Sequence, residues 1–126
     1  ARMVELAAQA NTAPHFMAIF HTAKYPSPDG HTYMMFHPNA WGNYMSTSWY
    51  KNDEVSKLCE EARATVDPEK QFELYGKAQE IVVEDAGALF IANPLHRMAH
   101  RERVTGYTFI GVLGYDLTWY PMRIAK

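Results

Sequence analysis

Residues 52–87, NDEVSKLCEEARATVDPEKQFELYGKAQEIVVEDAG, carry the clearest structural pattern of the chain and predict two consecutive amphipathic helices. The first helix starts at a capping residue, Asn52 or Asp53. Apolar residues then recur at i, i+3, i+4, i+7 and i+11, which places on one face Val55, Leu58, Cys59, Ala62 and Val66. A helix with one apolar face packs against a core, so this stretch is expected to cover the core of the fold.

The second helix of this stretch has its own start and stop signals. Asp67 is the expected N-cap, and Pro68 occupies the first helical position, where its missing N–H is not needed. Glu73 and Lys77 form an i, i+4 ion pair worth about 0.3 kcal/mol. Gly87 is placed to end the helix. The stripe predicted to be buried consists of Leu74, Tyr75, Ala78, Ile81 and Val82.

The flanking sequence predicts shorter elements around these helices. Residues 1–10 have the pattern of a helix, while the apolar runs 16–20 and 88–92 are each consistent with a buried strand. Residues 25–50 mix aromatics, glycines and prolines without a period, which indicates a structured loop region. The tail 104–124 is expected to form extended segments, broken at Gly111 and Gly114. The predicted fold class is therefore α/β, a short mixed sheet packed by amphipathic helices.

Composition limits the class of protein. The 126 residues suffice for one domain with a core, and 48% of them are hydrophobic. A formal net charge of −2 gives no basic field for nucleic acid. No uninterrupted apolar stretch reaches the 18 residues that would indicate a membrane-spanning helix. The single cysteine, Cys59, excludes an internal disulfide and lies on an apolar helix face, so it is interpreted as a buried hydrophobe.

The segment FHTAKYPSPDGH, residues 20–31, ends an apolar run on polar and aromatic side chains that a simple connecting loop does not need. We therefore expect ligand-binding residues at this strand end, namely His21, Thr22, Lys24 and Tyr25. Trp41 and Tyr44, together with Trp49, are candidate stacking surfaces for a solute. The alternatives are that Lys24 reaches water or pairs with Asp29, and that the other side chains only pack.

Read together, several short motifs resemble one known family. They are an aromatic residue and Asn before the first helix (Tyr50, Asn52), EAR (61–63), DPEK (67–70), LYGKAQEIVVEDA (74–86) and RVTGY (103–107). In this order they are similar to the C-terminal region of extracytoplasmic solute-binding proteins of ABC transporters, in the dipeptide, oligopeptide and nickel-binding family called family 5.

The resemblance implies a fold and a role. It implies one lobe of a type II periplasmic binding protein, with residues 1–95 in the C-terminal ligand-binding lobe and 96–126 as a tail that returns toward an N-terminal lobe. We accordingly expect a piece of a longer polypeptide. The implied function is capture of a solute for uptake, without chemical change to it. The implied partners are transporter membrane subunits, and the implied location is periplasmic or extracytoplasmic.

One departure from the family bears on the solute. Relatives carry a pattern like W-x-x-D-Y after the strand, and in peptide-binding members the aspartate pairs with the α-ammonium of the peptide. Here His21 stands at the aromatic position and Lys24 at the aspartate, while Tyr25 is retained. Two buried ammonium groups repel each other. A solute other than an ordinary free-amine peptide is therefore expected, with a carboxylate, phosphate or sugar-like group.

Other classes of function have weaker support in the sequence. His96 and His100 have a metal-ligand spacing, but Arg97, Arg101 and Arg103 would repel a dication, so no metal or other cofactor is expected. His31 and His37 are interpreted as loop or surface residues. The competing hypotheses are a small metal-binding or hydrolytic enzyme domain that uses His21, Lys24 and His37, and a helical interaction module.

Overall fold

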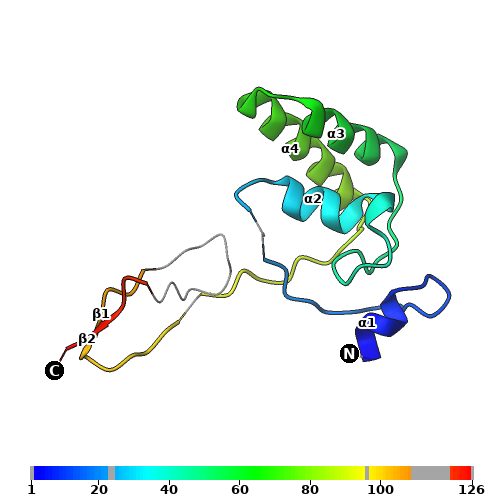
Figure 1. The fold of residues 1–126 in the computed structure, drawn as a ribbon. Coiled ribbons are helices and arrows are strands. Elements are labelled where there is room, and N and C mark those ends of the chain that lie inside the picture. Colours follow the sequence, from blue (N-terminus) through cyan, green and yellow to red (C-terminus); the bar gives the residue numbers. More distant parts are fainter. Residues whose placement is uncertain (1, 23–24, 96, 109–119, 126) are drawn as a thin grey trace.

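The computed structural model describes residues 2–22, 25–95, 97–108 and 120–125 (Figure 1). Three helices that lie together form the main body, and a small pair of strands lies apart from them. In chain order the elements are α1 (Arg2–Ala7), α2 (Asp29–Phe36), the 3-10 helix η1 (Pro38–Ala40), α3 (Asp53–Ala64), α4 (Pro68–Glu84), β1 (Val104–Thr105) and β2 (Arg123–Ile124). Helices accompanied by a small sheet are compatible with the predicted α/β class.

Helix α3 begins as predicted and ends earlier. The side chain of Asn52 accepts hydrogen bonds from the backbone N–H groups of Glu54 and Val55, at 2.9 and 3.2 Å, which identifies Asn52 as the N-cap. Most of the predicted apolar face is buried. Val66 is the exception, because α3 ends at Ala64 and leaves this side chain 95% exposed.

Helix α4 also has the predicted start, and its end differs in detail. Asp67 accepts a hydrogen bond from the backbone N–H of Glu69, and Pro68 is the first helical residue. At the other end, Ala86 has a φ of +52° and Gly87 donates its backbone N–H to the carbonyl of Val82 at 3.0 Å. This is a Schellman motif in which Ala86, rather than Gly87, occupies the left-handed position.

Helix α2 was not predicted, since residues 25–50 were expected to be irregular. Its inward face is small and polar, with Asp29, Gly30 and Thr32 buried beside Phe36. Such a face gives no apolar periodicity, so its helical character is not visible in the sequence. The helix packs against both α3 and α4, and together they enclose a core of Phe36, Val55, Cys59, Ala62, Leu74, Tyr75, Ala78 and Val82.

The two predicted buried strands are wrong as elements of this structure. Residues 16–20 and 88–92 are irregular, and Phe20 and Ile91 are 86% and 72% exposed. A buried strand requires a neighbouring strand for its backbone hydrogen bonds, and neither run is paired in a sheet within the described residues. The predicted helix over residues 1–10 is shorter, Arg2–Ala7.

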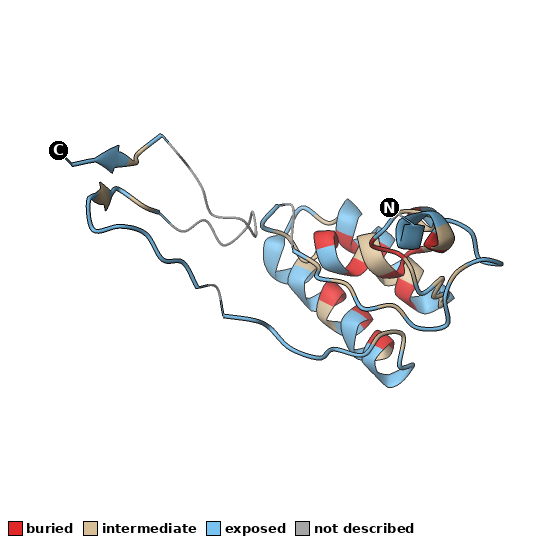
Figure 2. Ribbon diagram, turned by 90° about the horizontal axis from the view of Figure 1, so that it is seen from below, coloured by how far each residue is buried: buried red, intermediate tan, exposed pale blue. Residues whose placement is uncertain are grey.

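The tail contains the one sheet seen in the described residues. Val104 pairs with Ile124 and Thr105 with Arg123 in an antiparallel ladder. Figure 2 shows that the buried residues gather in the helical body, whereas the strands and the segment that leads to them are mainly exposed. The helices thus pack on one another here and not on this sheet. The predicted breaks at Gly111 and Gly114 lie outside the described residues.

Candidate functional site

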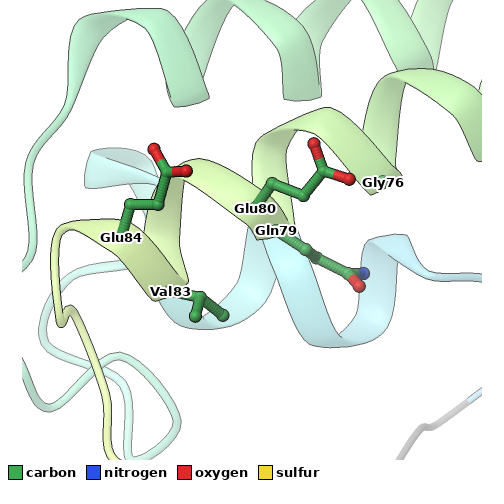
Figure 3. A pocket seen from close by; sticks show the side chains of 5 residues that line it. All are labelled: Gly76, Gln79, Glu80, Val83 and Glu84. Carbon is green, nitrogen blue, oxygen red and sulfur yellow. The ribbon is translucent and has the colours of Figure 1, made fainter.

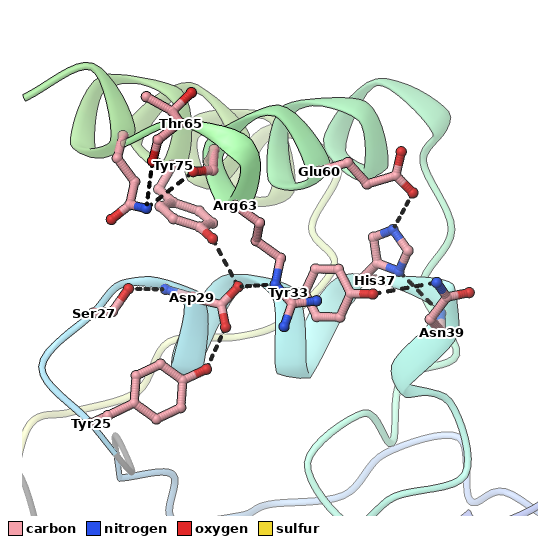
Figure 4. Close-up of polar contacts among 12 residues, drawn as sticks. Tyr25, Ser27, Asp29, Tyr33, His37, Asn39, Glu60, Arg63, Thr65 and Tyr75 are labelled. Atoms are coloured by element: carbon pink, nitrogen blue, oxygen red, sulfur yellow. Dashed lines mark hydrogen bonds and ion pairs between the residues drawn. The ribbon is translucent and has the colours of Figure 1, made fainter. Parts of the chain in front are cut away.

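The carboxylate of Asp29 fixes the start of α2 against the other helices (Figure 4). Its Oδ1 accepts a hydrogen bond of 2.8 Å from the hydroxyl of Tyr75 on α4 and lies 3.1 Å from Nε of Arg63 on α3. Its Oδ2 accepts a hydrogen bond from the Tyr25 hydroxyl. Asp29 is only 7% exposed, so three donors compensate the burial of this charge.

The hydrogen bond from its hydroxyl to Asp29 holds Tyr25 at the edge of an open hollow. The hollow has a volume of about 430 Å3, and we call it the Tyr25 hollow; it is lined by Tyr25, Pro26, Ser27, Pro28, His31, Phe72 and Gln79. Tyr25 is 39% exposed, so part of its ring is available to a ligand. Burial of the hydroxyl, followed by the hydrogen bond to Asp29, raises the pKa of Tyr25 to about 12. The group is therefore a neutral donor at neutral pH.

His21 lies next to this hollow through its contact with His31. The two Nδ1 atoms are 2.6 Å apart, and the rings meet edge to face with centroids 4.5 Å apart. Nε2 of His21 lies 3.0 Å from the sulfur of Met45. Tyr25 lines the hollow together with His31, and His21 contacts His31. His31 was interpreted as a loop or surface residue, and it is exposed in the first turn of α2.

Of the other predicted site residues, two are exposed, one makes a structural hydrogen bond, and one lies outside the described residues. Thr22 and Tyr44 are exposed, and Tyr44 precedes Met45, which contacts His21. The indole N–H of Trp41 donates to the carbonyl of Tyr50 at 3.0 Å, so it stabilises the loop before α3. Lys24 lies outside the described residues.

Trp49, the third aromatic candidate, also has a structural role. Its ring centroid lies 5.2 Å from that of Trp41, and its indole N–H donates to the carbonyl of Ala7 at 3.1 Å. This bond joins the loop before α3 to the end of α1. Trp49 adopts a φ of +52°, a strained conformation for an aromatic residue.

His37 was interpreted as a loop or surface residue; it lies in the short connection between α2 and η1, but it is buried and not at the surface. Its side chain is 4% exposed and stacks on the ring of Tyr33 with centroids 4.1 Å apart. Nδ1 accepts the backbone N–H of Asn39, which places the ring proton on Nε2, 3.4 Å from a carboxylate oxygen of Glu60. His21 contacts His31 in the first turn of α2, whereas His37 follows the C-terminal end of that helix, so His21 and His37, which the enzyme hypothesis combined, lie at opposite ends of α2.

A second hollow, of about 440 Å3, lies along the outer face of α4 (Figure 3). It is lined by Gly76, Gln79, Glu80, Val83 and Glu84, and it shares Gln79 with the Tyr25 hollow. Gln79 donates to the hydroxyl of Thr32 at 2.9 Å, which attaches α4 to α2 at this point. Phe72 and Val83, 57% and 58% exposed, add apolar area on the same helix.

The sequence was also interpreted with respect to a metal site and to a membrane-spanning helix. Among the described residues, no group of three or more His, Cys, Asp or Glu side chains is arranged to hold a metal ion. His96, half of the pair that suggested a metal, lies outside them. No helix in the described part of the chain is both long and apolar enough to cross a membrane.

In sequence the chain is similar to bacterial proteins that bind dipeptides and oligopeptides. One is the Probable D,D-dipeptide-binding periplasmic protein DdpA of Escherichia coli (strain K12), 36% identical over 62 residues. Another is the oligopeptide-binding protein AppA of Bacillus subtilis (strain 168), 29% identical over 77 residues. The matches cover 49% and 61% of this chain but only 12% and 14% of those proteins. No model of a protein family and no solved structure matches the chain.

Proposed function

We propose that this chain is part of an extracytoplasmic solute-binding protein that captures a small solute for an ABC importer. The similarity to a periplasmic dipeptide-binding protein and to an oligopeptide-binding protein supports a role in solute binding and transport. The observation that carries the proposal is the placement of Tyr25 in an open hollow and of His21 against the histidine that lines it.

The proposed site is one wall of a cleft, and a second lobe supplies the other wall. Residues 1–95 belong to the ligand-binding lobe, and residues 96–126 lead toward the opposing lobe. The openness of both hollows supports this arrangement, because ligand sites normally bury most of their ligand. The chain's small share of the length of its relatives supports it as well. Closure of two lobes on the solute would provide most of the affinity.

The proposed solute is peptide-like or another small molecule that carries an acidic or oxygen-rich group. The polar groups at the described edge of the cleft are the imidazoles of His21 and His31 and the oxygen of the Tyr25 hydroxyl, whose single proton is already donated to Asp29. Lys24, at the place where relatives have an aspartate, would add a positive charge and repel a free α-ammonium. The proposed role is binding and delivery to transporter membrane subunits, with no enzymatic step.

Calorimetric titration of the full-length protein that contains this chain tests the proposal. The probes are a free-amine dipeptide, its N-acetylated form and a small dicarboxylate. We expect the acetylated peptide or the dicarboxylate to bind at least tenfold more tightly than the free-amine dipeptide, a difference of about 1.4 kcal/mol. Tight binding of the free-amine peptide with no binding of the other two would overturn the solute assignment, and no binding of any probe would oppose the binding role.

Two matched variants connect the titration to the hollow. Phe72→Ala removes an exposed apolar side chain from the lining of the Tyr25 hollow, whereas Val66→Ala removes one that is 95% exposed elsewhere. We expect Phe72→Ala to weaken binding about tenfold and Val66→Ala to leave it unchanged. The 126-residue chain alone should bind each probe weakly, and tight stoichiometric binding by it would contradict the two-walled cleft.

A further inference from the structure

Two parts of the chain differ strongly in charge. Residues 1–94 contain seven Lys or Arg and twelve Asp or Glu, whereas residues 95–126, which we call the basic tail, contain five and two. The formal charges at pH 7 are therefore −5 and +3, with histidine neutral. Such an asymmetry within one chain indicates that the basic part meets a negatively charged partner.

In the described part of the basic tail, four exposed arginines carry the positive charge: Arg97, Arg101, Arg103 and Arg123. In the part of the chain that the structure describes, none of these four side chains forms an ion pair. The guanidinium of Arg123 donates instead to the carbonyls of Tyr120 and Met122, at 2.8 Å each. Figure 1 shows this part of the chain, in orange and red, apart from the helices. The positive charge is therefore available to a partner.

The strand pair separates charged from apolar side chains. Val104 pairs with Ile124, and the backbone N–H of Ala125 donates to the carbonyl of Arg103 at 2.8 Å, which continues the ladder by one residue. Because side chains alternate between the two faces of a strand, Arg103 and Arg123 lie on one face, and Val104 and Ile124 lie on the other. The ribbon is thus amphipathic, and the Ile124 residue on its apolar face is 71% exposed.

The apolar side chains near the arginines indicate what kind of acidic partner fits. Leu95 and Tyr120 are 79% and 88% exposed in the same tail. Arginine binds phosphate groups with its planar fork of donors, and tyrosine is enriched where a membrane meets water. Arginines on one face and apolar residues on the other are typical of segments that lie in the interface of an anionic membrane. An acidic protein surface would need the charges alone.

We propose that the basic tail binds the surface of an anionic phospholipid membrane. Arg97, Arg101 and Arg103 contact the lipid phosphates, while Tyr120 and Ile124 enter the interface. The negative charge of residues 1–94 turns the helical body away from the same surface, so the asymmetry also orients the chain. The proposal concerns a surface outside the Tyr25 hollow and does not depend on the proposed role in solute binding.

The test is co-sedimentation of the purified 126-residue chain with vesicles made of equal parts phosphatidylglycerol and phosphatidylcholine, and with vesicles of phosphatidylcholine alone. We expect at least about tenfold tighter binding to the anionic vesicles, and loss of this preference when salt is raised from about 0.02 M to about 0.5 M. Since the whole chain has a net charge of −2, such a preference requires a local basic surface. The combined changes Arg97→Gln, Arg101→Gln and Arg103→Gln should weaken binding about a hundredfold, because each arginine near an anionic surface contributes about fivefold.

The matched control removes the same charge from three exposed lysines of the helical body and the residues before it: Lys51→Gln, Lys57→Gln and Lys70→Gln. Circular dichroism verifies that each variant is folded. We expect this control to change vesicle binding less than about threefold, because these side chains do not face the membrane. Equal losses in the two triple variants would show a general effect of net charge and would overturn the proposal.

Polyglutamate, a soluble acidic polymer, separates a membrane from an acidic protein as the partner. We expect Tyr120→Ser to weaken vesicle binding severalfold, because it removes apolar area from the interface, and to leave binding to polyglutamate unchanged. If the parent chain binds polyglutamate as tightly as anionic vesicles and Tyr120→Ser affects neither, the partner is an acidic protein and the membrane assignment is wrong. Absence of any preference for anionic vesicles also overturns the proposal, while the proposed solute binding would stand.

Discussion

The hydroxyl of Tyr50 donates a hydrogen bond of 2.5 Å to Oδ2 of Asp85 and so joins the segment before α3 to the end of α4. Asn52, the N-cap of α3, donates to the same oxygen from its amide at 2.8 Å. One carboxylate therefore connects the start of one core helix to the end of the next. The bond from Tyr50, followed by that from Asn52, lowers the pKa of Asp85 below its ordinary value.

A pH dependence of stability follows from this pair. Because the pKa of Asp85 is lower in the folded state, its contribution is present above the unfolded pKa, about 3.9, and is lost as the pH falls through the folded value. Tyr50→Phe removes the hydroxyl, which is the main cause of the lowered pKa of Asp85, and keeps the aromatic ring. We expect the variant to unfold more easily than the parent at neutral pH, with the difference shrinking below about pH 4.

Urea unfolding measured from about pH 7 down to about pH 2.5 gives the free-energy difference between parent and variant at each pH. The control is the same comparison in an Asp85→Asn background, where the difference should no longer change with pH. If the free-energy difference between the parent and Tyr50→Phe stayed constant down to the lowest pH, the hydrogen bond between Tyr50 and Asp85 would not be the cause of the pH dependence.

The end of α4 predicts opposite effects for two adjacent substitutions. Ala86 occupies the left-handed region, so Ala86→Gly removes strain and should raise the free energy of unfolding by about 0.5–1 kcal/mol. A Cβ on Gly87 would stand 2.9 Å from Cδ2 of Tyr50, so Gly87→Ala should lower the free energy of unfolding by about 1–3 kcal/mol. Urea unfolding of the two variants measures both changes in the free energy of unfolding. If the two changes had the same sign, the assignment of Ala86 to the left-handed position and of Gly87 to the position after it would be wrong.

How far the sequence predicts the fold depends on whether its signals are local. Helices α3 and α4 were predicted with their caps at Asn52 and Asp67, because both the caps and the apolar spacing lie within a few residues. Helix α2 was missed because its stability depends on distant partners: Asp29 bonds to Tyr75, 46 residues away, and Thr32 to Gln79, 47 residues away. No pattern within α2 reveals those contacts.

The residues of the candidate site likewise differ in whether the sequence alone can reveal them. His21 and Tyr25 were predicted as ligand-binding residues because polar side chains at the end of an apolar run need an explanation. Tyr25 lines the Tyr25 hollow and His21 contacts its lining residue His31, and their role in binding stays a prediction. Phe72 and Gln79 line the same hollow from α4, and only the packing of α4 against α2 brings them there. The apolar runs 16–20 and 88–92 have the composition of strands, but composition does not supply the neighbouring strand they need.

Asp29 should be the most sensitive polar position in the helical body. Asp29→Asn keeps the size, removes the charge that faces Arg63 and leaves the buried hydroxyl of Tyr75 with a poorer acceptor. We expect the free energy of unfolding to fall by about 2–3 kcal/mol, measured by urea unfolding. The matched control is Glu73→Gln, which breaks the exposed pair with Lys77 and should change the free energy of unfolding far less, because water already screens this pair. Equal effects of the two changes would refute the anchoring role of Asp29.

Chemical labelling of the single thiol, that of Cys59, tests whether the same core is closed. Cys59 is fully buried, and burial, followed by the charge of Asp29, raises its pKa to about 12. At about pH 8 the thiol is therefore protonated as well as inaccessible, so a disulfide reagent reacts with it only after the helices open. We expect labelling of the folded chain to be slower than labelling in urea by about a thousandfold or more.

A comparison of variants then separates local opening from global unfolding around Cys59. If labelling requires global unfolding, Asp29→Asn should accelerate it by roughly 30–150-fold, the equivalent of its predicted 2–3 kcal/mol. Glu73→Gln should accelerate it less than about twofold. Cys59→Ala, which has no thiol, verifies that the signal comes from this residue. Rapid labelling of the parent chain without denaturant would mean that α2, α3 and α4 do not enclose Cys59 as a stable core, and the anchoring role of Asp29 would fail with it.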